Sequence, residues 1–299
     1  MQTKHLYFVG MSKNCFGTLK KNLDFLQKFK ENANFKVHIL IIDSDSNDST
    51  KEYCLRLKNE DIIEEFIEID NLQEKYKSRI KRIVICRNEG LKKIKSNFIG
   101  PAFYIPMDMD MDLFKLIDIK KFINLLNYFN IEDIDALFPF SKPYYYDIFA
   151  LRKNGWVSKN NIVKAEQLKK KFVIGSFFIN YFYIIRKQYS PNKFSKNLIS
   201  VESAFGGMAI YKINTSEKLN NNYKWNKTDS TKTCEHVYFN KYFDKKYILR
   251  SWNIETPKEH NYFKSLNYYQ KFNYFLKTLI QDLINLNYKV LKLRKKSTD

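Results

Sequence analysis

The chain has 299 residues, of which 44 % are hydrophobic and 16 % are aromatic. This composition is sufficient for a packed core and excludes global disorder, and the length suits one large α/β domain or two small ones. The 52 Lys and Arg residues outnumber the 32 Asp and Glu residues, and the formal net charge of +20 indicates anionic partners such as nucleic acid, anionic lipid or phosphorylated substrates. AT-rich codons, which encode Lys, Asn, Ile, Phe and Tyr, are a competing explanation for part of this charge.

The cysteines and the hydropathy pattern both indicate a cytoplasmic protein. Cys15, Cys54, Cys86 and Cys234 are scattered and form no CxxC pair, so we expect reduced thiols and no zinc site. No apolar stretch approaches the roughly 18 residues that a membrane span needs, and the N-terminus lacks the apolar region of a signal peptide. We therefore expect a cytoplasmic protein that is soluble or peripheral at the inner membrane face.

The first half of the chain predicts alternating strands and helices. Strands are expected at residues 5–9, 37–42, 62–69, 98–107 and 136–140, and helices at 16–29, 78–94 and 113–129. The run at 37–42 is rich in β-branched residues, which is typical of a parallel strand covered on both faces. The alternation indicates an α/β fold with a Rossmann-like, mostly parallel central sheet, which binds ligands at the C-terminal ends of its strands.

The second half is less regular. Residues 160–190 are helix-like, a Gly-Gly turn feeds a strand that ends near residue 211, and residues 218–233 form a polar loop. A long helical pattern follows, so we expect a main domain over residues 1–260 and a basic amphipathic helix over residues 261–299. This helix either docks against the core or lies on a membrane surface.

A ladder of acids follows the apolar strand at 98–107. Asp108, Asp110 and Asp112 alternate with methionines, and residues two apart face the same side of a strand. Their mutual repulsion raises their pKa values or requires a cation, and a hard divalent ion with oxygen ligands is the natural candidate. The alternative is a solvated loop whose acids cap the following helix.

Polar side chains before the ladder suit a nucleotide. Asp43 opens a run of small polar residues at a strand exit, which can bind a base or ribose, or can simply cap a helix. Arg82 and Arg87 lie on the next predicted helix and offer forked donors to a diphosphate. A solvated basic face is the alternative for these two arginines.

Two motifs after the ladder carry further chemistry. Glu235 precedes His236, and such a pair can supply a general base, a metal ligand or a purely structural contact. Gly206 and Gly207 let the backbone approach an anion or a sugar closely, and a simple tight turn explains them as well.

The order of these motifs resembles glycosyltransferases of the GT-A fold, and within that fold the group related to fungal capsule-associated α-1,3-mannosyltransferases. The matching stretches are residues 42–50 (IDSDSNDST), 82–88 (RIVICRN), 104–110 (YIPMDMD), 146–152 (YDIFALR), 203–211 (SAFGGMAIY) and 234–236 (CEH).

The resemblance implies a nucleotide-sugar donor held by Mn²⁺ or Mg²⁺, and it assigns a role to each motif. Asp43 would contact the base or ribose, and Arg82 and Arg87 the nucleotide. Asp108 and Asp110 correspond to the DxD motif, and Gly206 and Gly207 would line the donor-sugar and acceptor side, together with residues 146–152.

For the last motif, the resemblance implies that His236 is a third metal ligand, and that Glu235 deprotonates the acceptor if the reaction inverts. Asp112 departs from the family pattern, so the choice of the two metal-binding carboxylates stays open.

The expected function is metal-dependent transfer of a sugar to a glycan or lipid-linked acceptor in surface polysaccharide or glycoconjugate synthesis. A nucleotidyltransferase that makes the sugar nucleotide is one alternative, although such enzymes usually carry a glycine-rich basic loop after the first strand, where residues 10–15 contain one glycine. A basic nucleic-acid-binding protein is the other, but no binding motif supports it, so no nucleic-acid partner is expected.

Overall fold

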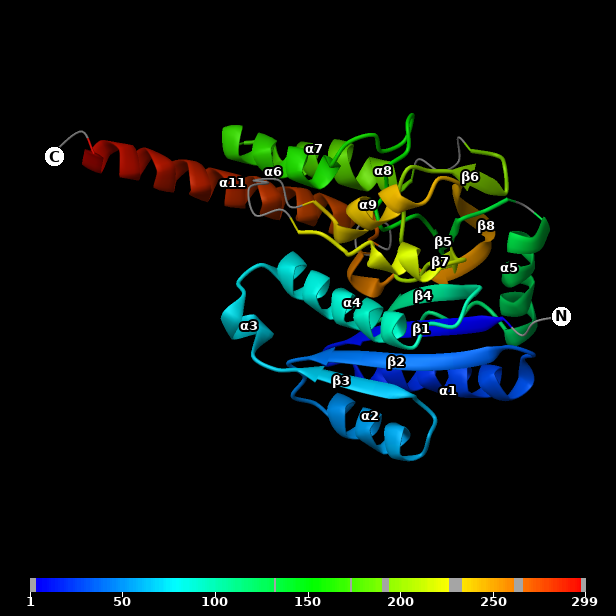
Figure 1. The fold of residues 1–299 in the computed structure, drawn as a ribbon. Helices are drawn as coiled ribbons and strands as arrows, with labels where there is room; N and C mark the ends of the chain where they lie inside the picture. The colour runs from blue at the N-terminus through cyan, green and yellow to red at the C-terminus, as the bar shows by residue number, and fades with distance from the viewer. Residues whose placement is uncertain are drawn as a thin grey trace.

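The structure is a computed structural model that describes residues 4–131, 133–172, 174–189, 194–225, 233–260 and 266–296. These residues form a mixed α/β fold on an 8-stranded sheet of order β3-β2-β1-β4-β7-β5-β8-β6 (Figure 1). The strands are β1 (His5–Ser12), β2 (Lys36–Ser44), β3 (Glu65–Ile69), β4 (Ala102–Asp108), β5 (Ala136–Lys142), β6 (Leu198–Ser200), β7 (Ile210–Ile213) and β8 (Lys246–Glu255).

The pairing within the sheet is mostly parallel. Strand β1 pairs in parallel with β2 and β4, β2 with β3, and β5 with β8, whereas β7 and β6 run antiparallel to their neighbours. The predicted α/β class with a mostly parallel central sheet is therefore confirmed. Because β1, β2 and β4 point the same way, the residues that follow them gather at one edge.

Helices cover both faces of the sheet (Figure 1). One core joins the sheet to α1, α2 and α5, and the other joins it to α4 and α9, so the central strands are buried on both sides, as their continuous apolar runs require. The helices of the first half are α1 (Phe16–Asn32), α2 (Thr50–Asn59), α3 (Leu72–Lys75), α4 (Arg79–Ser96) and α5 (Ile119–Ile131).

Helix α5 begins six residues later than the expected start at residue 113. The Asp118 carboxylate accepts a hydrogen bond from the Lys121 backbone N–H at 2.8 Å. The backbone carbonyl of Asp118 accepts a second one from the Phe122 N–H at 2.9 Å. Phe114 and Ile117 are buried in the preceding turns. The apolar spacing of these two residues correctly predicted that their side chains are buried. The backbone, however, becomes helical only after the Asp118 cap.

The second half consists of short elements and one long helix. The helical segments are α6 (Asn161–Lys171), α7 (Ser176–Asn180), the π-helix η1 (Tyr181–Ile185), α8 (Arg186–Gln188), η3 (Ser216–Asn220), α9 (Glu235–Phe239), η4 (Asn240–Tyr242), η5 (Lys258–His260) and α11 (Tyr268–Lys296). Within the predicted polar loop, residues 226–232 lie outside the described part of the chain. The division into 1–260 and 261–299 stays a prediction, and none of the described helices meets the length and hydropathy that a membrane span requires.

Candidate functional site

The acid ladder lies at the end of the central strand β4. The Asp108 backbone N–H donates to the Gly207 carbonyl at 2.8 Å, and the Met109 N–H donates to the Met11 carbonyl of β1 at 3.0 Å. Met109 is fully buried, Asp110 is exposed, and the Asp108 side chain is 33 % exposed. The alternation in the sequence thus becomes an alternation in space, in which Met109 is buried, Asp108 is partly exposed and Asp110 is exposed.

Asp112 lies beside different residues from Asp108 and Asp110. Its carboxylate lies 3.3 Å from the Lys21 ammonium of α1. The fully buried Asn22 fixes this part of the chain, because its amide donates to the Met111 carbonyl at 2.8 Å and accepts from the Leu113 N–H at 3.0 Å. Asp112 therefore has a surface counter-charge from α1, whereas Asp108 faces a different cation.

That cation is Arg87 of α4, which joins the ladder to the Glu-His motif. Its Nη2 lies 2.8 Å from Asp108 Oδ1 and its Nε lies 3.2 Å from Glu235 Oε1, while its side chain is only 2 % exposed. The guanidinium carbon lies 4.7 Å from the centroid of the Phe205 ring and 5.5 Å from that of Tyr223. The buried charge is thus balanced by two carboxylates and two aromatic faces.

The pKa of Asp108 is perturbed chiefly by burial, in a site where carboxylates outnumber this guanidinium. Burial raises the pKa of Asp108 to about 7, Arg87 opposes that rise, and the charges of Asp110, Glu235 and Asp147 add to it. A site with this excess of negative charge repels a diphosphate unless a further cation is present. The electrostatics therefore suit a bound metal ion.

His236 is buried beside this network as a neutral imidazole. Its ring stacks on Phe205 at a centroid distance of 3.6 Å, and its Nε2 lies 3.5 Å from Glu235 Oε1. Burial and, secondly, the charge of Arg87 lower the pKa of His236 well below 6.5. Neither ring nitrogen has a hydrogen-bond partner within the described structure, although the residue is only 1 % exposed.

The predicted three-ligand metal set is not assembled by these side chains. Across the described ranges, no group of three or more His, Cys, Asp or Glu residues is arranged to hold a metal ion. Asp108 and Asp110 nevertheless fit a divalent ion, because Mg²⁺ commonly uses one or two carboxylates and completes its shell with water and substrate phosphates. The role of His236 as a third ligand stays a prediction.

Gly206 and Gly207 bring the backbone against the acid ladder. Both have positive φ, +75° and +90°, which favours glycine. A Cβ on Gly207 would lie 2.3 Å from Met111 Sδ and 3.2 Å from Tyr146 Oη. The glycines therefore serve a tight turn and a close approach at once, and their contact with a sugar stays a prediction.

Asp147 lies within the stretch at 146–152 that the resemblance assigned to the donor-sugar and acceptor side, but it was given no role of its own. Its Oδ2 accepts the Gly206 N–H at 2.8 Å, its Oδ1 accepts the Ala150 N–H at 3.2 Å, and burial raises its pKa. Within the stretch at 146–152 (YDIFALR), Asp147 is the one acid, which was its only signal in the sequence. Its partner is 59 residues away, so local pattern could not identify it.

Asp43 and Arg82 both hold loops near the strand ends. The fully buried Asp43 carboxylate accepts from Ser12 Oγ at 2.9 Å and from Ser46 Oγ at 2.5 Å, which ties the exits of β1 and β2 together. Arg82 Nη1 donates to the carbonyls of Tyr76 and Lys77 at 2.6 and 3.2 Å. The nucleotide contacts expected of Asp43 and Arg82 stay predictions.

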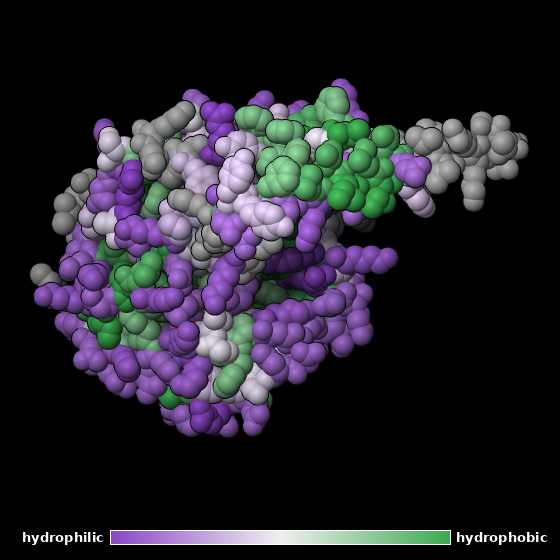
Figure 2. Space-filling model, turned by 180° about the vertical axis from the view of Figure 1, so that it is seen from behind, coloured by the Kyte–Doolittle hydropathy of each residue, from purple (hydrophilic) through white to green (hydrophobic). Residues whose placement is uncertain are grey.

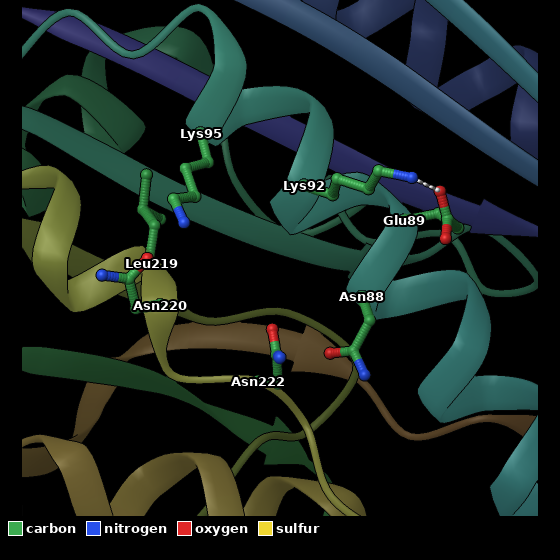
Figure 3. Close-up of a pocket in the computed structure, with 7 residues that line it drawn as sticks. All are labelled: Asn88, Glu89, Lys92, Lys95, Leu219, Asn220 and Asn222. Atoms are coloured by element: carbon green, nitrogen blue, oxygen red, sulfur yellow. Dashed lines mark ion pairs between the residues drawn. The ribbon is translucent and has the colours of Figure 1, made fainter.

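A polar cavity of about 340 Å³ lies on α4, next to the site (Figure 3). Its lining residues are Asn88, Glu89, Lys92, Lys95, Leu219, Asn220 and Asn222. Asn88 donates to the Tyr223 carbonyl at 3.0 Å and accepts from the Tyr223 N–H at 2.8 Å. The cavity wall thus positions the aromatic ring that lies over the Arg87 guanidinium.

Comparisons with known proteins yield structural likenesses only. No protein-family model matches the chain, and no curated protein matches it. Among solved structures it is similar to mannosyltransferase PcManGT from Pyrobaculum calidifontis in complex with GDP-Man and Mn²⁺, with 11 % identity, a TM-score of 0.49 and coverage of 86 % of this chain and 59 % of that one. It is also similar to S. aureus TarS 1–349 in complex with UDP-GlcNAc, with 12 % identity, a TM-score of 0.44 and the same coverages.

A third similar structure is M. tuberculosis glucosyl-3-phosphoglycerate synthase, with 10 % identity, a TM-score of 0.41 and coverage of 85 % of this chain and 73 % of that one. The chain spans about three-fifths of the length of the first two structures. With TM-scores below 0.5, these likenesses assign neither an activity nor a residue role to this chain.

Proposed function

We propose that this protein is a metal-dependent glycosyltransferase of the GT-A type, which moves a sugar from a nucleotide-sugar donor to a glycan or lipid-linked acceptor. One observation carries the proposal: Asp108 and Asp110 leave the C-terminal edge of a central parallel strand where the Gly207 backbone and the Arg87–Glu235 pair meet. In open α/β sheets this edge is the usual ligand site.

Asp108 and Asp110 are the residues that would hold the metal. Mn²⁺ or Mg²⁺ there would stabilise the charge that develops on the departing nucleoside diphosphate. Asp110 is exposed and so accessible to a ligand, and Arg87 stabilises the ionised form of Asp108 beside it. Arg87 also adds fixed positive charge at the place where the leaving group becomes more negative.

In the proposed reaction the acceptor hydroxyl oxygen bonds to the anomeric carbon of the sugar. The bond from that carbon to the diphosphate oxygen breaks, and the hydroxyl proton passes to a base. Glu235 is the candidate base if the reaction inverts, and Arg87 fixes the position of its carboxylate. If the reaction retains configuration, Glu235 serves only as the partner of Arg87.

The narrower proposal follows the motif resemblance to the capsule-associated α-1,3-mannosyltransferase group. It places the protein in surface polysaccharide or glycoconjugate synthesis, in the cytoplasm or at the inner membrane face.

The position of Gly10 argues against the nucleotidyltransferase alternative, which requires a glycine-rich loop after the first strand. This glycine lies inside β1, and a Cβ on it would lie 2.7 Å from Ile41 Cδ1 and 2.8 Å from the Met109 side chain. Its absence of a side chain therefore serves strand packing, whereas a phosphate-binding loop needs accessible backbone N–H groups.

A thermal-shift panel of UDP-, GDP- and CMP-sugars with and without Mn²⁺ tests the donor. We expect one nucleotide class to stabilise the protein, and to do so only with the metal. Tight, salt-sensitive binding of RNA or DNA without any metal requirement would overturn the proposal in favour of a nucleic-acid-binding protein.

The acid ladder offers a matched pair of variants. Asp110→Asn should abolish metal-dependent hydrolysis of the donor, whereas Asp112→Asn, whose carboxylate pairs with Lys21, should retain it. His236→Ala tests the predicted third ligand, and unchanged Mn²⁺ affinity in this variant would remove His236 from the metal site. Full activity of Asp110→Asn would refute the metal assignment.

A further inference from the structure

A broad hydrophobic surface lies over the base of α11 and the neighbouring α7 and η1, as Figure 2 shows from behind. We call it the α7–α11 face. Its members are each between 49 % and 56 % exposed, and they are Phe172, Ile174, Phe178, Phe182, Phe272, Ile280, Leu283 and Ile284. Contiguous exposed apolar side chains on this scale mark an interaction site.

One side of α11 is fixed against α7. The Asp282 carboxylate accepts hydrogen bonds from the backbone N–H groups of Gly175 and Ser176, both at 2.9 Å, and the residue is only 4 % exposed. The Phe275 ring packs on the rings of Phe177 and Phe178, with centroid distances of 5.1 and 5.9 Å. These contacts define the inner face of the helix.

The outer face of α11 carries exposed isoleucines among its polar residues. At 3.6 residues per turn, Ile280 and Ile284 lie roughly 160° around the helix from Asp282. They are 55 % and 56 % exposed. A helix that packs on its own domain by one side normally presents polar residues on the other, so two exposed isoleucines beside Lys277 on this side indicate an external partner.

The charges around the face identify the chemistry of that partner. The basic residues of α11 whose side chains the structure describes are Lys271 and Lys277, and those of α6 and α8 are Lys164, Lys169, Lys170, Lys171, Arg186 and Lys187. The acids in the same elements are Glu166 and Asp282, and Asp282 is buried against α7. A second copy of the chain would bring like charges together, whereas a surface of anionic headgroups would complement them.

We propose that the α7–α11 face binds an anionic lipid surface. Ile280, Leu283 and Ile284 enter the boundary between headgroups and acyl chains, to a depth of about 5–10 Å, and the flanking lysines contact the headgroups. Apolar burial and electrostatic attraction then act together, so binding is reversible and sensitive to lipid composition. This inference stands apart from the proposed activity, because none of its residues belongs to the acid-ladder site.

Vesicle flotation of the full chain tests the proposal. We expect the protein to float with phosphatidylcholine vesicles that contain phosphatidylglycerol, to bind pure phosphatidylcholine vesicles much less, and to lose binding as salt is raised. Absence of binding to the anionic vesicles overturns it. A concentration-dependent dimer in light scattering that the α11 variants abolish, without vesicle binding, would assign the face to a second copy.

Three variants separate the contribution of apolar burial to vesicle binding from the contribution of electrostatic attraction. Ile280→Glu/Ile284→Glu should weaken binding to anionic vesicles at least about tenfold, because apolar area is lost and repulsive charge is added. Leu55→Glu/Ile99→Glu is the matched control, since these residues are 49 % and 52 % exposed but lie on other elements, and it should bind almost as wild type.

Lys169→Glu/Lys170→Glu/Lys171→Glu leaves the apolar residues in place and should reduce binding to the anionic vesicles specifically. Circular dichroism and the thermal midpoint verify the fold of each variant. Equal losses in the α11 variant and the Leu55/Ile99 control would mean that net charge alone drives adsorption, which contradicts the assignment to this face.

Discussion

Arg87 Nη2 lies 2.8 Å from Asp108 Oδ1, which couples helix α4 to the end of the central strand β4. The same guanidinium reaches Glu235 through its Nε, at 3.2 Å. A single buried cation thus holds the first acid of the ladder and the acid of the Glu-His motif in one network. Because buried charges are tolerated only with partners, each member depends on the other two.

Arg87→Met should lower the free energy of unfolding by about 3–5 kcal/mol, because it leaves the buried Glu235 and the partly exposed Asp108 without their counter-charge. Arg87→Met/Glu235→Gln should recover part of this loss, since one of the two charges is removed. Urea unfolding followed by tryptophan fluorescence measures both. A single variant as stable as wild type would contradict the network.

The pH dependence of stability should carry the signature of Asp108. Its pKa is raised from 3.8 to about 7, chiefly by burial, so the folded state holds the proton more tightly than the unfolded state does. The resulting stabilisation is complete below pH 3.8 and is lost as the pH rises towards about 7.

In metal-free protein, the stability of wild type relative to Asp108→Asn should therefore fall between these pH values. Urea unfolding with a chelator, over a pH series, measures the difference. A wild-type advantage that grows with pH would show that ion pairing with Arg87 outweighs burial.

Gly207→Ala should destabilise the protein and disturb the site. The substitution combines the strain of positive φ with a clash against Met111 Sδ at 2.3 Å, so we expect a cost of about 2–5 kcal/mol. Gly155→Ala is the matched control, because Gly155 also has positive φ, +77°, but nothing lies within 4 Å of its Cβ position. It should cost about 1–2 kcal/mol, and thermal unfolding of the two variants separates strain from clash. Equal effects would mean that the close approach to Met111 is unimportant.

The four thiols should resist alkylation in the native protein. Cys15, Cys54, Cys86 and Cys234 are free and buried, and burial raises the pKa of Cys15 and Cys54 to about 12, of Cys86 to about 11, and of Cys234 well above 9. Little thiolate is therefore present at neutral pH. Mass spectrometry after iodoacetamide treatment should find no modification before denaturation and modification of all four afterwards. Rapid labelling of one thiol would contradict this prediction, because it would show that this cysteine is accessible to solvent in the native protein.

The sequence predicted the first half of the fold well, because its signals are local. A continuous apolar run specifies β2, and the apolar stretch before the acid ladder specifies β4, to within a few residues at most ends. Strand β8 was not predicted. It lies beside β5 through residues more than a hundred positions apart, with a register shift between Pro139 and Phe140, so its neighbours decide its conformation.

By itself, then, the sequence determined the α/β class, the mostly parallel sheet and the position of Asp108 and Asp110 at a strand end. These features could be predicted because they depend on the spacing of apolar and polar residues that are close together in the chain. Only the tertiary structure decided which charges meet. It joins Arg87 to Glu235 across 148 positions, turns Asp112 towards α1, and leaves Ile280 and Ile284 exposed on the outer side of α11. These relationships depend on the order of strands in the sheet and on helix docking, which no local pattern encodes.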